Sequence, residues 1–306
     1  MLPRVNGSTE SYLADLDRIQ SNLDTIQRQV SSGIRVGLAS DDPSAVPGIL
    51  EAQSQIAADQ QSQTNLNLVK ADLQTGDGAL QQAVTLVEQA ISLGARGANL
   101  APPDPQYSVL EKQVQSIQEQ LVQISATSAN GRYIFSGDLE GQALYTLDNT
   151  QPTGVRRLAP ARSTLVIADT DGTPLWKPIT AQDIFDARNP DGTPAAGNVF
   201  AAVNSLVSAM QSQNDQAAQT AIGMLKSADE HLNLQLGLYG IAENRASDAL
   251  DTASKSLTNE QQALSTDRDT DVASAAIQLS QLTLQQQAAL SARAKISQLS
   301  LFDFLA

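Results

Sequence analysis

The sequence contains no cysteine and a single histidine, so it lacks most of the side chains that nucleophilic and transition-metal sites require. Without cysteine there can be no disulfide and no thiolate chemistry. His231 belongs to no His-Glu-x-x-His cluster, and the sequence has no glycine-rich phosphate cradle. We therefore predict that the protein is not an enzyme and that it binds no metal and no cofactor.

Aromatic residues are also scarce, at 4% of the 306 residues with one tryptophan, whereas 41% of the residues are apolar. Cores must therefore be built from aliphatic and small side chains, which suits thin helical bundles. No apolar run approaches the ~20 residues that span a bilayer, and the first residues contain no apolar signal-peptide core. We expect neither membrane insertion nor a cleaved signal.

Basic residues are few: 19 Lys and Arg oppose 33 Asp and Glu, which gives a net charge of −14 and a pI of about 4.4. Such a surface repels the phosphates of nucleic acids and anionic membranes. Nucleic acid is therefore an unsuitable partner.

What the sequence does contain is heptad patterning at both ends. After Tyr12 the apolar positions alternate in steps of four and three until Gly33, which suits a helix C-terminus; they are Leu16, Ile19, Leu23, Ile26 and Val30. The last segment carries a looser stripe, interrupted by Gln286 and Arg293, with apolar positions at Val272, Leu279, Leu282, Ala289, Ile296 and Leu299. Open stripes of this kind predict pairing with each other and with other copies of the chain.

Between these ends the pattern predicts two antiparallel helices. A helix should begin at Asp42-Pro43, with a kink or a delayed start because Pro47 lacks an amide donor. Its seam narrows to small residues, including Gly76 and Gly94, and the proline-rich stretch 101–105 ends it. The next helix carries a seam from Leu110 and should end near Asn130-Gly131.

Residues 131–198 change character, with frequent Pro and Gly and the turn pairs Asp171-Gly172 and Asp191-Gly192. We predict a small inserted β-rich domain with strands at 132–135 and 163–168. Helical periodicity resumes at Val199 and becomes very long after Asn214.

The fold class predicted is therefore mainly α: an elongated helical bundle or coiled coil formed by the N- and C-terminal regions, with one β-rich insertion. The predicted segments are a terminal coiled-coil segment and loop (1–42), a helical rod (43–130), the insertion (131–198), the rod's second half (199–266) and a terminal coiled-coil segment (267–306).

Two groups of carboxylates allow a chemical interpretation. Asp41 and Asp42 could form a paired acid/base site, but capping of the following helix is the simpler explanation. Asp267, Asp269 and Asp271 alternate as in a calcium loop, yet the glycine and the terminal glutamate of such a loop are missing. Capping of the last helix is favoured there as well.

Two segments carry a family resemblance. SSGIRVGLASDDPSAV (31–46) resembles the signature of the flagellin superfamily of bacterial flagellar axial proteins. The run DVASAAIQLSQLTLQQQAALSARAKISQLSLFDFLA (271–306) is similar to the ending of the members that join the flagellar hook to the filament. Within the first segment, the residues that carry the signature are Gly33, Arg35, Asp41, Asp42 and Pro43.

The resemblance implies a structural subunit of the extracellular flagellum that joins hook to filament by coiled-coil packing of its terminal helices. Its implied partners are copies of itself, the adjacent hook-associated protein and flagellin layers, an export chaperone and the flagellar type III export apparatus. Three alternatives stay open: flagellin itself, an enzyme displayed on the flagellum with its chemistry in 131–198, and a cytoplasmic scaffold coiled coil.

Overall fold

The computed structural model describes the backbone of residues 7–168 and 172–302, and the side chains of 9–168 and 172–294. The chain divides into two compact units. The first contains the residues up to 58 together with those from 256 onward, and the second contains residues 59–255. The division falls inside two long helices, α2 (Val46–Gly97) and α6 (Asp215–Arg268), so each of them contributes to both units.

The first unit is completed by α1 (Gly7–Ser32) and α7 (Val272–Phe302). Helix α1 ends at the predicted glycine: Gly33 has φ +71°, a left-handed conformation that costs glycine little. Helix α2 begins at Val46, not at Asp42, so Pro47 occupies its first turn, where a missing amide donor is tolerated. The delayed start expected from Pro47 is thus what the structure has.

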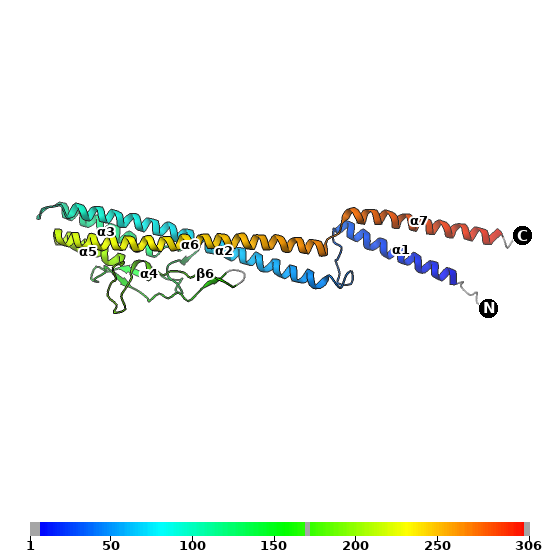
Figure 1. Ribbon diagram of the computed structural model, residues 1–306, viewed down its shortest axis with the longest axis horizontal. Coiled ribbons are helices and arrows are strands. Elements are labelled where there is room, and N and C mark those ends of the chain that lie inside the picture. Colours follow the sequence, from blue (N-terminus) through cyan, green and yellow to red (C-terminus); the bar gives the residue numbers. More distant parts are fainter. Residues whose placement is uncertain (1–6, 169–171, 303–306) are drawn as a thin grey trace. The chain divides into compact units, whose positions relative to one another are not determined.

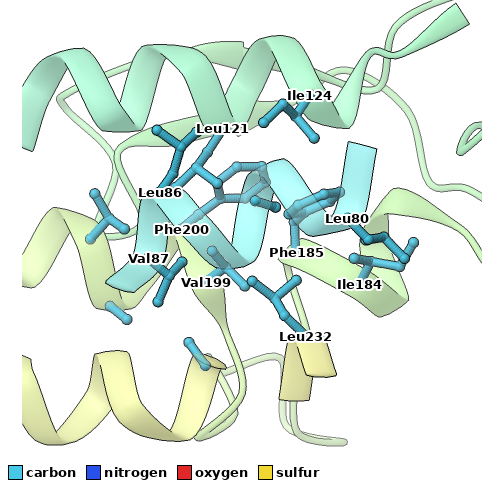
Figure 2. Packing of buried hydrophobic residues seen from close by; sticks show 14 of the residues in the cluster. Leu80, Leu86, Val87, Leu121, Ile124, Ile184, Phe185, Val199, Phe200 and Leu232 are labelled. Carbon is cyan, nitrogen blue, oxygen red and sulfur yellow. The ribbon is translucent and has the colours of Figure 1, made fainter. Parts of the chain in front are cut away.

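The second unit is a helical bundle that contains parts of α2 and α6 together with two further helices, α3 (Gln106–Ser125) and α5 (Val199–Gln211). Helix α3 packs on α5 (Figure 1). Asn198 caps α5 by accepting a hydrogen bond from the amide of Ala201 (2.8 Å). Figure 2 shows the core, where aliphatic side chains surround Phe185 and Phe200, whose rings stack at 5.8 Å. Phe200 and Leu80 have no exposed surface.

The prediction that α3 continues to Asn130-Gly131 is wrong, because the chain leaves the helix at Ser125 and turns back as a hairpin. Strand β1 (Ser128–Ala129) pairs antiparallel with β2 (Arg132–Tyr133). Asn130 and Gly131 both have positive φ (52° and 79°), as the two central residues of the tightest hairpin turns require. The Asn-Gly pair is therefore a hairpin turn and not a helix end.

The insertion contains two further two-stranded antiparallel sheets. Strand β3 (Tyr145–Leu147) pairs with β4 (Val155–Arg157), with Tyr145 opposite Arg157. Strand β5 (Ile167–Ala168) pairs with β6 (Pro174–Trp176), and a short helix, α4 (Ala181–Phe185), follows. The strands are shorter than the predicted 132–135 and 163–168. One reason is that Phe135 turns away into the core, edge-on to Phe185 at 6.1 Å.

A buried carboxylate ties the insertion together. Asp186 has no exposed surface and accepts hydrogen bonds from Arg157, Arg188, Tyr145 (3.1 Å) and Asn198 (2.9 Å). The guanidinium groups of Arg157 and Arg188 compensate the negative charge of Asp186, which lowers the energetic cost of burying it. Because Asn198 also caps α5, the network links the insertion to the start of that helix.

Candidate assembly surface

Helices α1 and α7 pack against each other and run antiparallel (Figure 1). The Tyr12 hydroxyl donates a hydrogen bond to the carbonyl of Ala289 (3.2 Å), and Arg293 donates one to Oγ1 of Thr9 (3.3 Å). The Arg293 guanidinium also lies 5.6 Å from the centroid of the Tyr12 ring, within cation–π distance. These contacts define the register of the two helices.

The facing sides of both helices follow a heptad. In α1 the partly or fully buried positions include all five predicted seam residues: Leu16, Ile19, Leu23, Ile26 and Val30. The corresponding positions in α7 are Ala275, Leu279, Leu282, Gln286, Ala289 and Arg293. Among the side chains described in these two helices, only Leu23 and Ala275 are buried. The pair therefore leaves much of its own seam in contact with water.

One of the predicted α7 residues, Val272, is placed differently. Val272 is 50% exposed, and Ala275 is the buried residue at that turn. The reason is local: Asp271 caps α7 by accepting from the amides of Ala273 (3.0 Å) and Ser274 (3.2 Å), so Val272 lies in the open first turn. Ile296 and Leu299 lie within α7, but their side chains fall outside the described residues.

A second set of large apolar side chains on α1 and α7 is exposed. Ile277 and Leu284, one heptad apart on α7, are 60% and 67% exposed, and Leu13 and Leu290 are about equally open at 52% and 51%. Two packed helices can bury only one stripe of each. The remaining apolar surface is suited to packing against further helices.

The loop between α1 and α2 is anchored to the end of α6 through Arg35. The backbone amides of Arg35 and Val36 both donate to the carbonyl of Arg268 (2.7 and 3.1 Å), and the amide of Thr270 donates to the carbonyl of Gly33 (2.9 Å). The Arg35 guanidinium donates to the Asp267 carbonyl and forms an ion pair with Asp42 (2.8 Å). One side chain thus joins this loop to the connection before α7.

The two acidic residues of the loop organise turns. Asp41 accepts from the amides of Gly37 (3.1 Å) and Leu38 (2.8 Å), and Asp42 accepts from the amide of Ser44 (3.2 Å). The hydrogen bond from Arg35, followed by that from the Ser44 hydroxyl, lowers the pKa of the Asp42 carboxyl to about 2. A carboxyl that ionises so readily is a poor general acid or base near neutral pH.

The other groups considered for chemistry also have structural partners. Asp269 pairs with Arg268 (2.9 Å) and Asp271 caps α7, so these carboxylates do not converge. The His231 ring donates to the carbonyl of Asp183 (2.8 Å). Among the described residues, no three His, Cys, Asp or Glu side chains are grouped to hold a metal ion, and no helix is long and apolar enough to cross a membrane.

Arg293 interrupts the predicted apolar stripe, but in the structure it contacts Tyr12 and helps to set the register of α1 and α7. The role of Arg35 could not be predicted, because its acceptor near α6 is the backbone carbonyl of Asp267, which the sequence does not distinguish from other carbonyls. The only available signal was the pairing of an arginine with Asp42 in one short loop.

Part of the chain is similar to known proteins. Residues 5–139 match the family described as the bacterial flagellin N-terminal helical region. Over 124 residues the chain is 27% identical to the B-type flagellin of Pseudomonas aeruginosa. This region is flagellin-like. The match covers 40% of the present chain and only 25% of that flagellin, so the chain spans about a quarter of the length of this relative.

The flagellin-like chain also shares its fold with solved flagellar structures. A proposed flagellar hook-associated protein from Vibrio parahaemolyticus superposes with a TM-score of 0.64 at 18% identity, covering 75% of this chain and all (100%) of the other. FlgL of Bacillus cereus superposes with a TM-score of 0.51 at 17% identity, covering 65% of this chain and 98% of its own. The long-helix bundle with a small insertion is therefore a fold that such proteins have.

Proposed function

We propose that this chain is a structural subunit of the bacterial flagellum that joins the hook to the filament. The observation that carries the proposal is the fold shared with a hook-associated protein over three quarters of the chain, combined with the flagellin-like N-terminal region. The exposed apolar face of α1 and α7 supports it, because a subunit of an axial structure needs surfaces that bind other copies.

In this proposal the α1–α7 pair is completed only by neighbouring subunits. Ile277, Leu284, Leu13 and Val272 contact helices of adjacent copies, and the layers above and below are flagellin and another hook-associated protein. The subunit reaches this position through the flagellar type III export channel, with the help of an export chaperone. The terminal helices pack fully only on incorporation, which discourages premature polymerisation.

A second candidate is the filament subunit, flagellin, because the sequence match is to a flagellin. Copy number and position separate the two. Immunogold labelling of purified hook–basal bodies with filament stubs should place the junction protein in a narrow band at the filament base. Label along the whole filament would favour flagellin instead.

The assembly surface can be tested with Leu284→Gln in a strain of the source bacterium that lacks the chromosomal copy. Leu284 is 67% exposed, so the monomer should keep its thermal stability within about 0.5 kcal/mol. Swimming and the decoration of hooks should nevertheless be lost, since a polar amide then faces the neighbouring helix.

The matched control is Leu158→Gln, the same substitution at a 51% exposed leucine of the insertion. It should swim normally. Deletion of 272–306 should abolish filament attachment, and normal attachment by that variant would defeat the proposal.

A further inference from the structure

Within residues 59–255, a cavity of about 230 Å³ lies between α2, α6 and the insertion. Its apolar lining includes Leu73 of α2 and Ile134 of the insertion. Leu68 and Leu165, which also line it, are 49% and 57% exposed, so the cavity is open to solvent on that side. A cavity of this volume can hold a small organic ligand.

Two aromatic residues form one corner of this cavity. Trp176 of β6 and Tyr239 of α6 have ring centroids 5.2 Å apart and planes inclined by 67°, so the rings are close to perpendicular. Tyr239 is held in place because Phe135 packs against it on another side, at 6.2 Å. Indole and phenol faces attract a cation that lies within about 6 Å of the ring centroid, and the indole is the strongest of them.

Asp72, in the same lining, has a carboxylate oxygen that accepts no hydrogen bond from the described residues. Arg132 donates to Asp72 (2.7 Å) and to Glu140 (3.0 Å), so this triad carries one net negative charge. Within the described part of the chain, the second carboxylate oxygen of Asp72, Oδ1, is buried and has no hydrogen-bond partner. The hydroxyl of Ser163, also in the lining, is buried and unpartnered in the same way.

Asp138 is the other charged residue in the lining. It accepts hydrogen bonds from the amide and the hydroxyl of Thr164 (2.9 and 3.0 Å). The lining therefore contains three carboxylates and one guanidinium, a net charge of −2. An anionic ligand would be repelled by this charge, whereas a cation would be attracted by it.

We propose that this cavity binds a small alkylammonium cation of the choline type, with the ammonium against the partly exposed indole of Trp176 and facing Asp72. Aromatic faces attract methylated ammonium groups, because these groups are cationic yet only weakly hydrated. This site is independent of the assembly surface, since it lies in the other unit of the chain.

The single tryptophan makes the site directly observable, since all tryptophan fluorescence of the protein comes from Trp176. Choline and tetramethylammonium, titrated into the full-length monomer at low ionic strength, should shift this fluorescence saturably. The neutral isostere 3,3-dimethylbutan-1-ol has the same shape without the charge and should bind at least about tenfold more weakly. Equal binding of the isostere, or no response to either cation, would overturn the proposal without any variant being needed.

Two substitutions complete the test. Asp72→Asn keeps the size of the side chain and removes its charge, and should weaken choline binding about tenfold. The control Asp251→Asn makes the same change at an exposed position of α6 outside the cavity and should bind as the parent does. Equilibrium dialysis with labelled choline measures both without relying on fluorescence, and unchanged affinity in folded Asp72→Asn would refute the assigned role.

Discussion

Substitution of Gly76 by alanine tests whether small residues in the α2 seam are there for close packing. A Cβ built at Gly76 would lie 2.4 Å from Cε1 of Tyr239, and 3.1 and 3.2 Å from Cδ1 and Cζ of the same ring. Carbon atoms pack at about 3.5–4.0 Å, so the ring would have to retreat by roughly 1 Å. Phe135 and Trp176 pack against the ring and oppose such a movement.

The magnitude follows from two opposing contributions. Overpacking a fixed core site costs about 1–3 kcal/mol, whereas replacing a helical glycine by alanine gains about 1 kcal/mol. Gly76→Ala should therefore be neutral to about 2 kcal/mol less stable. Gly78→Ala offers the control: it is in the same helix, its added Cβ meets no atom within 4 Å, and it should be stabilised by about 0.5–1 kcal/mol.

Urea unfolding followed by circular dichroism and by Trp176 fluorescence measures both variants. Gly76→Ala should be less stable than Gly78→Ala by about 1–3 kcal/mol. The native fluorescence of Trp176 should change only in Gly76→Ala, because Tyr239 contacts that indole. Equal stabilities with unchanged fluorescence would show that the two helices have room at this position and that glycine is not needed there.

Three further predictions concern other parts of the chain. Arg35→Lys keeps the charge but loses the forked contact with Asp42 and the Asp267 carbonyl, which should cost the loop about 1 kcal/mol of local stability. Native-state proteolysis within residues 34–45 should therefore accelerate several-fold. Because the folded pKa of Asp42 lies below its unfolded value, its contribution is present above about pH 4 and is lost as the pH falls toward 2; pepsin cleavage of the loop should rise over that interval, and Asp42→Asn should remove the step. Asp186→Ala should destabilise the unit 59–255 by about 3 kcal/mol in urea, since two guanidinium groups lose a buried partner, whereas a loss below about 1 kcal/mol would mean that the network is not structural.

Several elements could be predicted because their determinants are local. The seam of α1 follows from heptad spacing, and its end follows from a glycine that takes positive φ. The helical fold class with a small insertion is confirmed, and α5 begins at Val199, where the insertion was predicted to end. In each case the hydrophobic pattern of the helix and the residue that begins or ends it lie within one or two helical turns of each other.

The errors arise where a local signal has two meanings or where distant residues decide. An Asn-Gly pair can end a helix, but it is also the strongest hairpin signal; at Asn130-Gly131 the hairpin forms, with Ser128 paired to Tyr133. The strand expected at 132–135 is cut short because Phe135 is needed in the core. The cavity beside Trp176 could not be predicted, since its walls come from α2, α6 and the insertion, which are far apart in sequence.

The composition of α7 explains why its pairing with α1 can be specific without being strong. Its seam positions include two alanines, a glutamine and an arginine, which bury little apolar surface against α1, while large aliphatic residues such as Ile277 and Leu284 face outward. Hydrophobic stabilisation scales with buried apolar area, so within residues 272–294, where the side chains are described, most of what α7 could contribute is not used in the monomer. The contacts that Arg293 makes with Tyr12 and Thr9 depend on geometry, and they select one register at little gain in area. A pair of helices built in this way holds its outer apolar face in a defined orientation, and the larger part of its burial energy becomes available only when another helix covers that face.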